Sequence, residues 1–131
     1  AMSTGEETFL RRFPDEVSFH TMGEGFTWDT QDRARDIAAA EAAWATSLEM
    51  IADPTLDLVL LDELNIALRY DYLDIHAVVA GLTARPQGKH VCVTGRNARP
   101  ELLAAADLVT EMTLVKHPFD QGVKAQRGID F

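Results

Sequence analysis

The sequence predicts an α/β fold in which helices flank a parallel sheet. Short apolar or β-leaning runs alternate along the chain with segments whose apolar residues recur every three or four positions. Polar or glycine-containing segments directly follow these short runs, as is common where strands of a sheet end. Such alternation is typical of parallel strands joined by right-handed helical crossovers.

The composition indicates one acidic globular domain spanning residues 1–131. The chain has 131 residues, of which 47% are hydrophobic, and its formal net charge is −9. This charge argues against nucleic acid or an anionic membrane as a partner, because both require a basic surface. The single cysteine, Cys92, excludes an intramolecular disulfide and fits the cytoplasm. No apolar run approaches the roughly 18 residues that a membrane span needs.

The first half of the chain predicts one strand and one long helix. Residues 17–22 (VSFHTM) are short and β-leaning, as expected for a strand. A helix is predicted over about residues 31–52, where apolar side chains form a stripe of helical spacing: Ile37, Ala40, Trp44, Leu48 and Ile51. Asp29 or Thr30 supplies its cap, and Asp53 with Pro54 ends it.

Residues 56–61 (LDLVLL) form an almost unbroken apolar run. Such a run predicts a strand buried on both faces of a parallel sheet. A second helix is predicted over about residues 75–84, with Asp74 as its cap and Pro86 and Gly88 beyond its end.

The last third predicts two strands around a short helix. Residues 91–94 (VCVT) read as a strand, and a helix over about residues 101–106 follows Pro100, which suits a first turn. The alternation in residues 108–115 predicts a final strand, and the tail after it has no clear period.

Three polar or glycine-containing segments follow predicted strands. They are residues 23–30 (GEGFTWDT), Asp62 with Glu63, and residues 94–96 (TGR). Because the carboxyl ends of parallel strands share one edge of the sheet, where ligands bind in open α/β folds, we expect these segments to converge on one site.

Asp62 and Glu63 end a strand in the manner of a Walker B element. Carboxylates at such a position can hold Mg²⁺ directly or through water. A solvated acidic strand end is the alternative explanation of the same pattern.

The other candidates are two aromatic residues and several cations. Phe26 and Trp28 form either an apolar platform for a flat ligand or packing beneath the sheet edge. Arg96, Lys124 and Arg127 are predicted to bind phosphate, with surface ion pairs or solvation as the alternative. A phosphate loop of the form G-x-x-x-x-G-K-[ST], which usually accompanies a Walker B element, is absent from this sequence.

Four segments in order carry a resemblance to a known family: GEGFTWDTQDR, LDLVLLDELNIALRYDYL, TGRNARPELLAAADLVTEM and VKHPFDQGVKAQRGIDF. They resemble the later part of the ATP:corrinoid adenosyltransferases of the cobalamin-biosynthesis type. The likeness runs from about Gly5 to Phe131, and the order and spacing of its four motifs make it specific.

The resemblance implies a RecA-like P-loop fold, a homodimer, and ATP, Mg²⁺ and a corrinoid as cofactors or substrates. The implied reaction moves the 5′-deoxyadenosyl group of ATP to the cobalt of a reduced corrinoid and releases triphosphate, with a flavoprotein reductase as a further partner. By position, Phe26 and Trp28 resemble the aromatics on the corrinoid side, where they would displace the lower axial ligand of cobalt. Asp62 and Glu63 resemble the acids associated with Mg²⁺ and triphosphate.

The chain departs from the family because it lacks the first strand, the P-loop and the first helix. The RecA-like sheet is therefore expected to be partial, with apolar strand faces exposed. Two other functions remain open from the sequence: a corrinoid-binding or regulatory module without catalytic activity, and another P-loop phosphotransferase.

Overall fold

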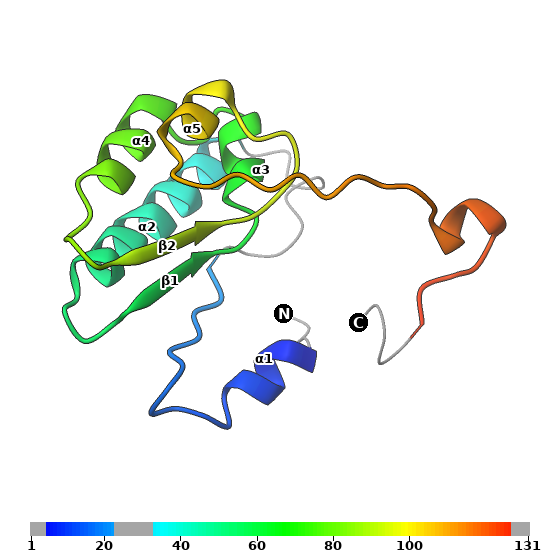
Figure 1. The fold of residues 1–131 in the computed structure, drawn as a ribbon, viewed down its shortest axis with the longest axis horizontal. Coiled ribbons are helices and arrows are strands. Elements are labelled where there is room, and N and C mark those ends of the chain that lie inside the picture. The colour runs from blue at the N-terminus through cyan, green and yellow to red at the C-terminus, as the bar shows by residue number, and fades with distance from the viewer. Residues whose placement is uncertain (1–4, 23–32, 127–131) are drawn as a thin grey trace. The chain divides into compact units, whose positions relative to one another are not determined.

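The computed structural model describes residues 5–22 and 33–126, and the chain divides into two compact units. Ala1–Thr21 and Thr110–Phe131 make up one unit, and Met22–Val109 make up the other. The described residues of the larger unit form a small sheet and four helices, so the predicted α/β class is confirmed (Figure 1).

The sheet consists of two parallel strands, β1 (Leu58–Leu61) and β2 (His90–Val93). Leu58 lies opposite His90, and Leu61 lies opposite Val93. The parallel arrangement predicted from the sequence is therefore confirmed, with strand bounds shifted by one or two residues. Because neighbouring parallel strands end at the same edge, the residues after Leu61 and after Val93 are brought together.

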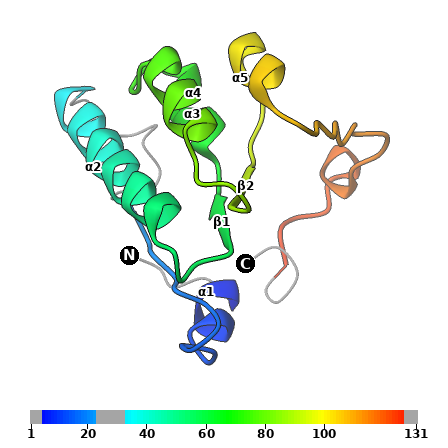
Figure 2. The same ribbon diagram turned by 60° about the vertical axis from the view of Figure 1, so that its left-hand side comes forward.

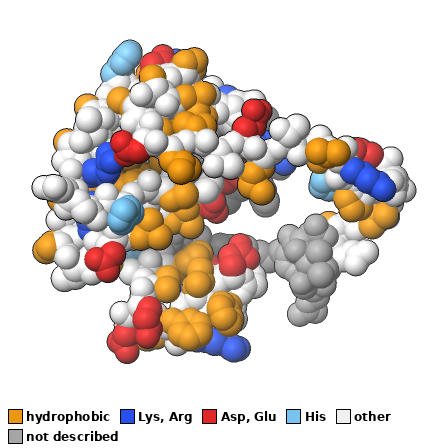
Figure 3. Space-filling model, viewed as in Figure 1, with side chains coloured by type: hydrophobic (Ala, Val, Ile, Leu, Met, Phe, Trp, Pro, Cys, Tyr) orange, Lys and Arg blue, Asp and Glu red, His pale blue; other side chains and the backbone are white. Residues whose placement is uncertain are grey.

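The described helices of this unit cover only one face of the sheet. Val59 and Leu61 are buried at 1% and 7% exposure, whereas Leu58 and Leu60 are each 59% exposed. Figure 2 shows the four helices of this unit gathered on one side of the strands, and Figure 3 shows apolar side chains over the two strands. The prediction of a strand buried on both faces is thus wrong within the described part of this unit, because no described helix of the unit covers Leu58 and Leu60.

The helices of the larger unit are α2 (Arg33–Ala52), α3 (Leu64–Arg69), α4 (Ile75–Thr83) and α5 (Pro100–Ala105). Three of them confirm predictions, and Asp74 caps α4 by accepting a hydrogen bond of 2.8 Å from the Ala77 backbone N–H. The helix α3 was not predicted, because its six residues show no clear period and it lacks a sequence signal such as Pro100, which marks the first turn of the equally short α5. None of the described helices is long and apolar enough to cross a membrane.

The core lies between the covered face of the sheet and these helices. Its most deeply buried side chains are Leu68, Val59 and Val78. Gly81 of α4 lies directly against α2, since a Cβ atom there would come within 2.8 Å of both Trp44 and Leu48. The predicted apolar stripe of α2 therefore does face another helix, and glycine permits the close approach.

The smaller unit contains α1 (Gly5–Leu10) and the single-turn helix η2 (Pro118–Gln121). The strand predicted at residues 17–22 is wrong, since these residues form no strand, and the strand predicted at residues 108–115 is wrong for the same reason. A strand needs a neighbour to pair its backbone N–H and C=O groups, and no described segment pairs with either stretch. Alternating apolar residues alone could not reveal that lack of a neighbour.

A buried lysine joins the amino ends of the two strands. Lys89, which precedes β2, is 8% exposed, and its Nζ donates to the backbone carbonyl of Asp53 at 2.6 Å and to that of Leu56. Burying an ammonium group is costly unless it is hydrogen-bonded, and these carbonyls meet that need. Lys89 thereby ties the turn before β1 to the start of β2.

The same turn is fixed by Asp53 and Thr55. The Thr55 hydroxyl and backbone N–H donate to Asp53 Oδ1 at 2.7 and 2.8 Å, and the hydroxyl bond is the main cause that holds the pKa of Asp53 below its ordinary value of 3.8. A carboxyl group with a lowered folded-state pKa stabilises the fold above its unfolded pKa. Its contribution is lost as the pH falls through the lowered folded-state value.

Lys89→Met is expected to lower the free energy of unfolding by about 1–3 kcal/mol, because methionine retains the length of the side chain but removes the ammonium donor. The Leu56 carbonyl then has no donor among the described residues, and the Asp53 carbonyl keeps only the Leu56 N–H at 3.3 Å. Lys116→Met, at an exposed position of the smaller unit, is the matched control and is expected to change stability by no more than about 0.5 kcal/mol. Chemical denaturation of both variants measures the difference. Equal stability of the two variants would contradict a structural role for Lys89.

Candidate functional site at the carboxyl ends of the strands

Polar residues from two segments meet where β1 and β2 end. The Thr94 hydroxyl donates to Asp62 Oδ1 at 2.6 Å and accepts a hydrogen bond of 3.0 Å from the Glu63 backbone N–H. The expected convergence is therefore confirmed for the segments after β1 and β2. The third segment, residues 23–30, lies outside the described residues.

Glu63 turns the chain from β1 into α3. Its backbone is left-handed, with φ 58° and ψ 21°, and its side chain makes no hydrogen bond to cap the helix. This conformation is unfavourable for a residue with a Cβ atom, and the bond from Glu63 N–H to Thr94 helps to hold it. The turn leaves the carboxylates of Asp62 and Glu63 on exposed residues at adjacent positions of the sheet edge.

Gly95 is packed tightly against this turn. Its φ of 123° is rarely adopted by residues with side chains, and an added Cβ would lie 2.8 Å from the Cβ of Asn65 and 3.2 Å from Glu63 Oε2. Only glycine therefore allows the segment after β2 to pass so close to the start of α3. This close passage keeps the backbone of Gly95 beside the Glu63 carboxylate.

Asn65 is a further candidate residue at this edge, and it was not among the residues predicted from the sequence. It is 4% exposed, and its Oδ1 atom is buried without a hydrogen-bond partner among the described residues. A buried amide oxygen without a donor is costly, so such groups in native proteins call for a reason. The sequence did offer a signal, because Asn65 stands between Leu64 and Ile66 in an apolar stretch, and asparagine is mostly exposed in folded proteins.

These oxygen atoms match the ligand chemistry of Mg²⁺. In proteins Mg²⁺ is held by one or two carboxylates together with water and substrate phosphates, and dedicated cages of protein ligands are uncommon. Asp62 and Glu63 supply two exposed carboxylates, and no group of three or more His, Cys, Asp or Glu side chains suited to a metal occurs among the described residues. The arrangement can thus hold a hydrated Mg²⁺ that a phosphate chain completes.

The cations predicted for this site are only partly placed. Arg96 is exposed beside Gly95, and no hydrogen bond or ion pair joins its side chain to the rest of the described chain. Lys124 is exposed and belongs to the smaller unit, whereas the strand ends belong to the larger unit. Phe26, Trp28 and Arg127 lie outside the described residues.

A shallow depression of about 380 Å³ occurs in the N-terminal segment and involves none of the predicted site residues. Its lining consists of Arg11, Pro14, Val17, Ser18, Phe19 and His20. Ser18 Oγ and His20 Nε2 lie 2.8 Å apart there. The carboxyl ends of β1 and β2 remain the place where oxygen ligands from separate segments meet.

The variants Gly95→Ala and Gly88→Ala compare the loss of stability at a tightly packed glycine with the loss at a glycine in open space. Gly88 also has a positive φ, 84°, but an added Cβ there meets no atom within 4 Å. We expect Gly88→Ala to cost about 1 kcal/mol of stability, and Gly95→Ala to cost at least about 1 kcal/mol more because of its contact with Asn65. Urea denaturation of both variants makes the comparison, and equal losses would show that Gly95 is not tightly packed.

Comparison with known proteins gives one consistent result. The sequence matches the family described as ATP:corrinoid adenosyltransferase BtuR/CobO/CobP over residues 1–131. It is 62% identical over 131 residues to a protein of Pseudomonas aeruginosa named corrinoid adenosyltransferase, covering 100% of this chain and 64% of that protein. It is 48% identical over 127 residues to the corrinoid adenosyltransferase CobA of Salmonella typhimurium, covering 97% of this chain and 64% of that protein.

A protein of Sinorhizobium sp with the name corrinoid adenosyltransferase is 56% identical over 133 residues, covering 100% of this chain and 62% of its own length. The chain thus spans slightly less than two thirds of the length of these curated relatives.

Proposed function

The chain belongs to the ATP:corrinoid adenosyltransferase family, and on this premise we propose that it serves to transfer the 5′-deoxyadenosyl group of ATP to the cobalt of a reduced corrinoid. In this reaction a cobalt–carbon bond forms at C5′ of the ribose. The C5′–O bond breaks, and triphosphate leaves with the bonding electrons. The match of residues 1–131 to the family is the observation that carries the proposal.

The strand ends supply the proposed binding site for the triphosphate. Asp62 and Glu63 would hold Mg²⁺, which neutralises phosphate charge when it is bound. Thr94 supports this role because its hydroxyl donates to one oxygen of Asp62 and so orients the carboxylate. A nucleophilic side chain is unnecessary, since the cobalt of the corrinoid substrate is itself the nucleophile.

Three cations are proposed to bind the phosphate chain. Arg96 is exposed directly after Gly95, and its guanidinium has five donors in a planar fork that suits phosphate oxygens. Lys124 and Arg127 are proposed as further phosphate contacts because they add positive charge to a chain whose net charge is −9. Local positive charge of this kind allows an acidic protein to bind a polyanion.

Phe26 and Trp28 are proposed to contact the lower face of the corrin ring. Two large apolar side chains at that face would exclude water and displace the lower axial ligand of cobalt. Four-coordinate Co(II) is then easier to reduce to the Co(I) state that reacts with ATP. The segment GEGFTWDTQDR, which resembles the family, supports this assignment.

We further propose that residues 1–131 form part of one RecA-like P-loop domain that a further segment completes. The uncovered face of the sheet, with Leu58 and Leu60 each 59% exposed, supports this idea because apolar strand faces are normally covered. In the longer protein the domain is proposed to act as a cytoplasmic homodimer that receives electrons from a flavoprotein reductase.

Asp62→Asn tests the metal site in a protein extended to the full length of its relatives. We expect the Mg²⁺ concentration for half-maximal adenosyl transfer to rise by roughly tenfold or more, because even the loss of a group that only orients a ligand commonly lowers metal affinity by that factor. Asp57→Asn, at the opposite end of the same strand, is the matched control. An unchanged Mg²⁺ dependence in Asp62→Asn would remove Asp62 from the metal site.

Phe26→Ala and Trp28→Ala test the corrinoid assignment. Both changes are expected to slow transfer that starts from Co(II) corrinoid with a reductant more than transfer that starts from pre-reduced Co(I) corrinoid. Phe9→Ala, at an aromatic residue of α1, is the control. Equal losses on the two routes would refute the axial-ligand role.

Calorimetry with corrinoid and with MgATP separates the enzyme from a non-catalytic module. Binding of both ligands by the extended protein supports the adenosyltransferase. Binding of corrinoid without ATP would favour the corrinoid-binding module instead.

A further inference from the structure

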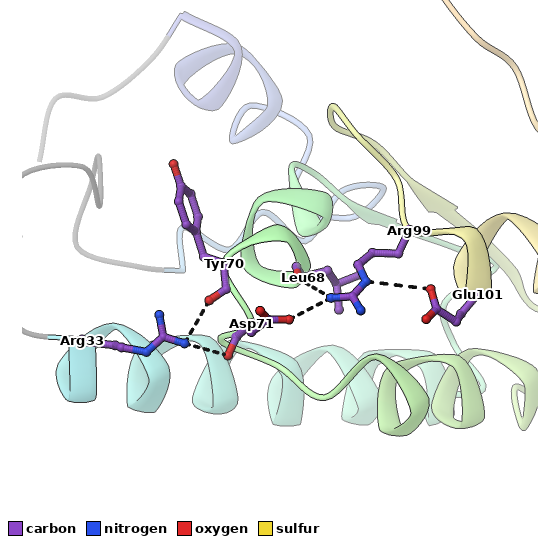
Figure 4. A network of polar contacts seen from close by, with 6 residues as sticks. All are labelled: Arg33, Leu68, Tyr70, Asp71, Arg99 and Glu101. Atoms are coloured by element: carbon purple, nitrogen blue, oxygen red, sulfur yellow. Dashed lines mark hydrogen bonds and ion pairs between the residues drawn. The ribbon is translucent and has the colours of Figure 1, made fainter.

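Two arginines converge on the turn that follows α3 (Figure 4). Arg99, just before α5, donates from Nη1 to Asp71 Oδ1 at 2.8 Å and to the Leu68 carbonyl at 3.5 Å. Arg33, the first residue of α2, donates from Nη2 to the carbonyls of Tyr70 and Asp71 at 3.1 and 3.4 Å. Three segments far apart in the sequence are therefore joined at this turn.

This turn needs partners from outside α3. The last carbonyls of a helix accept no hydrogen bond from an N–H group of the same helix. The helix dipole also makes that end negative, so arginine side chains stabilise it. With six residues, α3 is too short to persist without such contacts. Asp71 also has a left-handed backbone, with φ 53°, which sharply turns the chain away from the helix.

The segment from Thr94 to Arg99 contacts α3 at both of its ends. Thr94 accepts the N–H of Glu63, directly before the helix, and Arg99 reaches the Leu68 carbonyl and Asp71 at the other end. Between these two contacts lie Gly95, whose backbone passes close to Asn65, and the exposed Arg96. The contact of Arg99 therefore bears on how this whole segment lies beside the strand ends.

We propose that Arg99 and Asp71 are positioning residues for the site at the strand ends: they hold the segment from Thr94 to Arg99 along α3, and thereby keep Arg96 and Thr94 in place beside Asp62 and Glu63. What that site binds rests on the proposed function, whereas the positioning itself rests on the contacts above. Neither residue needs to touch a substrate.

The exposure of the pair favours positioning over stabilisation of the whole fold. The side chains of Arg99 and Asp71 are 33% and 72% exposed, and ion pairs so accessible to water contribute little to the free energy of unfolding. Glu101 Oε2 lies 3.8 Å from Arg99 Nε and attracts the other side of the guanidinium. Loss of the pair should therefore move the segment without unfolding the protein.

The chain contains a closely matched control. Arg85 Nη2 lies 2.6 Å from Asp107 Oδ2, with side chains 31% and 83% exposed, and Arg85 Nη1 also donates to a carbonyl at a helix end, that of Leu82. This pair has the same chemistry and similar exposure, but it holds neither α3 nor the segment after β2. Comparison of the two pairs therefore isolates the effect of position.

The first test compares Asp71→Asn with Asp107→Asn in a protein of the full length of the relatives. Asparagine tolerates a left-handed backbone, so Asp71→Asn removes the charge without imposing strain. We expect amide hydrogen exchange at Glu63 to accelerate by roughly fivefold in Asp71→Asn, the change that loss of one hydrogen bond produces. Asp107→Asn should leave it unchanged, with the same unfolding midpoint in both variants.

Arg99→Lys is a second variant with the charge retained. Both bonds of Arg99 come from Nη1, and a lysine Nζ can replace that single donor. Lysine has no second nitrogen to keep the contact of Arg99 Nε with Glu101 Oε2, so we expect an increase in Glu63 exchange between those of the wild type and Asp71→Asn. Unchanged exchange at Glu63 in Asp71→Asn, or an equal change in Asp107→Asn, would overturn the proposal.

The second test measures adenosyl transfer in the same variants. Asp71→Asn is expected to raise KM for ATP several-fold with a smaller effect on kcat, whereas Asp107→Asn should match the wild type. If the wild type shows no transfer but Glu63 exchange accelerates in Asp71→Asn, the proposed function fails and the positioning stands. If transfer occurs and neither Glu63 exchange nor KM responds to Asp71→Asn, the positioning is wrong and the function stands.

Discussion

The rest of the larger unit depends on the parallel register of β1 and β2, which side chains fix at both ends. At the amino ends, Lys89 donates to carbonyls of the turn before β1. At the carboxyl ends, the Thr94 hydroxyl links β2 to Asp62 and Glu63. A sheet of two strands is marginal by itself, so helix packing and these cross-links must supply what further strands would otherwise give. Because the register is fixed, the positions of the residues that directly follow each strand are fixed as well.

This register also explains the crowding at the site. The chain leaves β1 through the left-handed Glu63 and enters α3 at once, while Gly95 leaves β2 against Asn65. Space for both paths exists only because one of the two residues facing each other lacks a Cβ atom. Carboxylates, a hydroxyl and a backbone segment are thereby concentrated at one edge, and Asn65 remains beneath them with an unpaired amide oxygen. The constrained backbone at Glu63 and Gly95 thus lies at the same sheet edge as the carboxylates that could bind a ligand.

The sequence predicted those elements whose signals are local. The stripe on α2, the Asp74 cap and Pro100 in the first turn of α5 each depend on neighbouring residues, and each prediction was confirmed. Strands depend on distant partners, and for that reason residues 17–22 and 108–115 were predicted wrongly. At the site, the meeting of Asp62 with Thr94 followed from strand order alone. The parts played by Asn65 and Arg99 did not, because they arise from how α3 packs after the chain has folded.

The uncovered sheet has a practical consequence for work on these 131 residues in isolation. The outer edges of β1 and β2 pair with no other strand in the described residues, and Leu58 and Leu60 lie beside them on the open face. Unpaired edges and adjoining apolar side chains act as templates for another chain. Association measured with the isolated chain would therefore report contacts made by this open sheet face and its unpaired edges, and its stoichiometry would carry no information about how the longer relatives assemble.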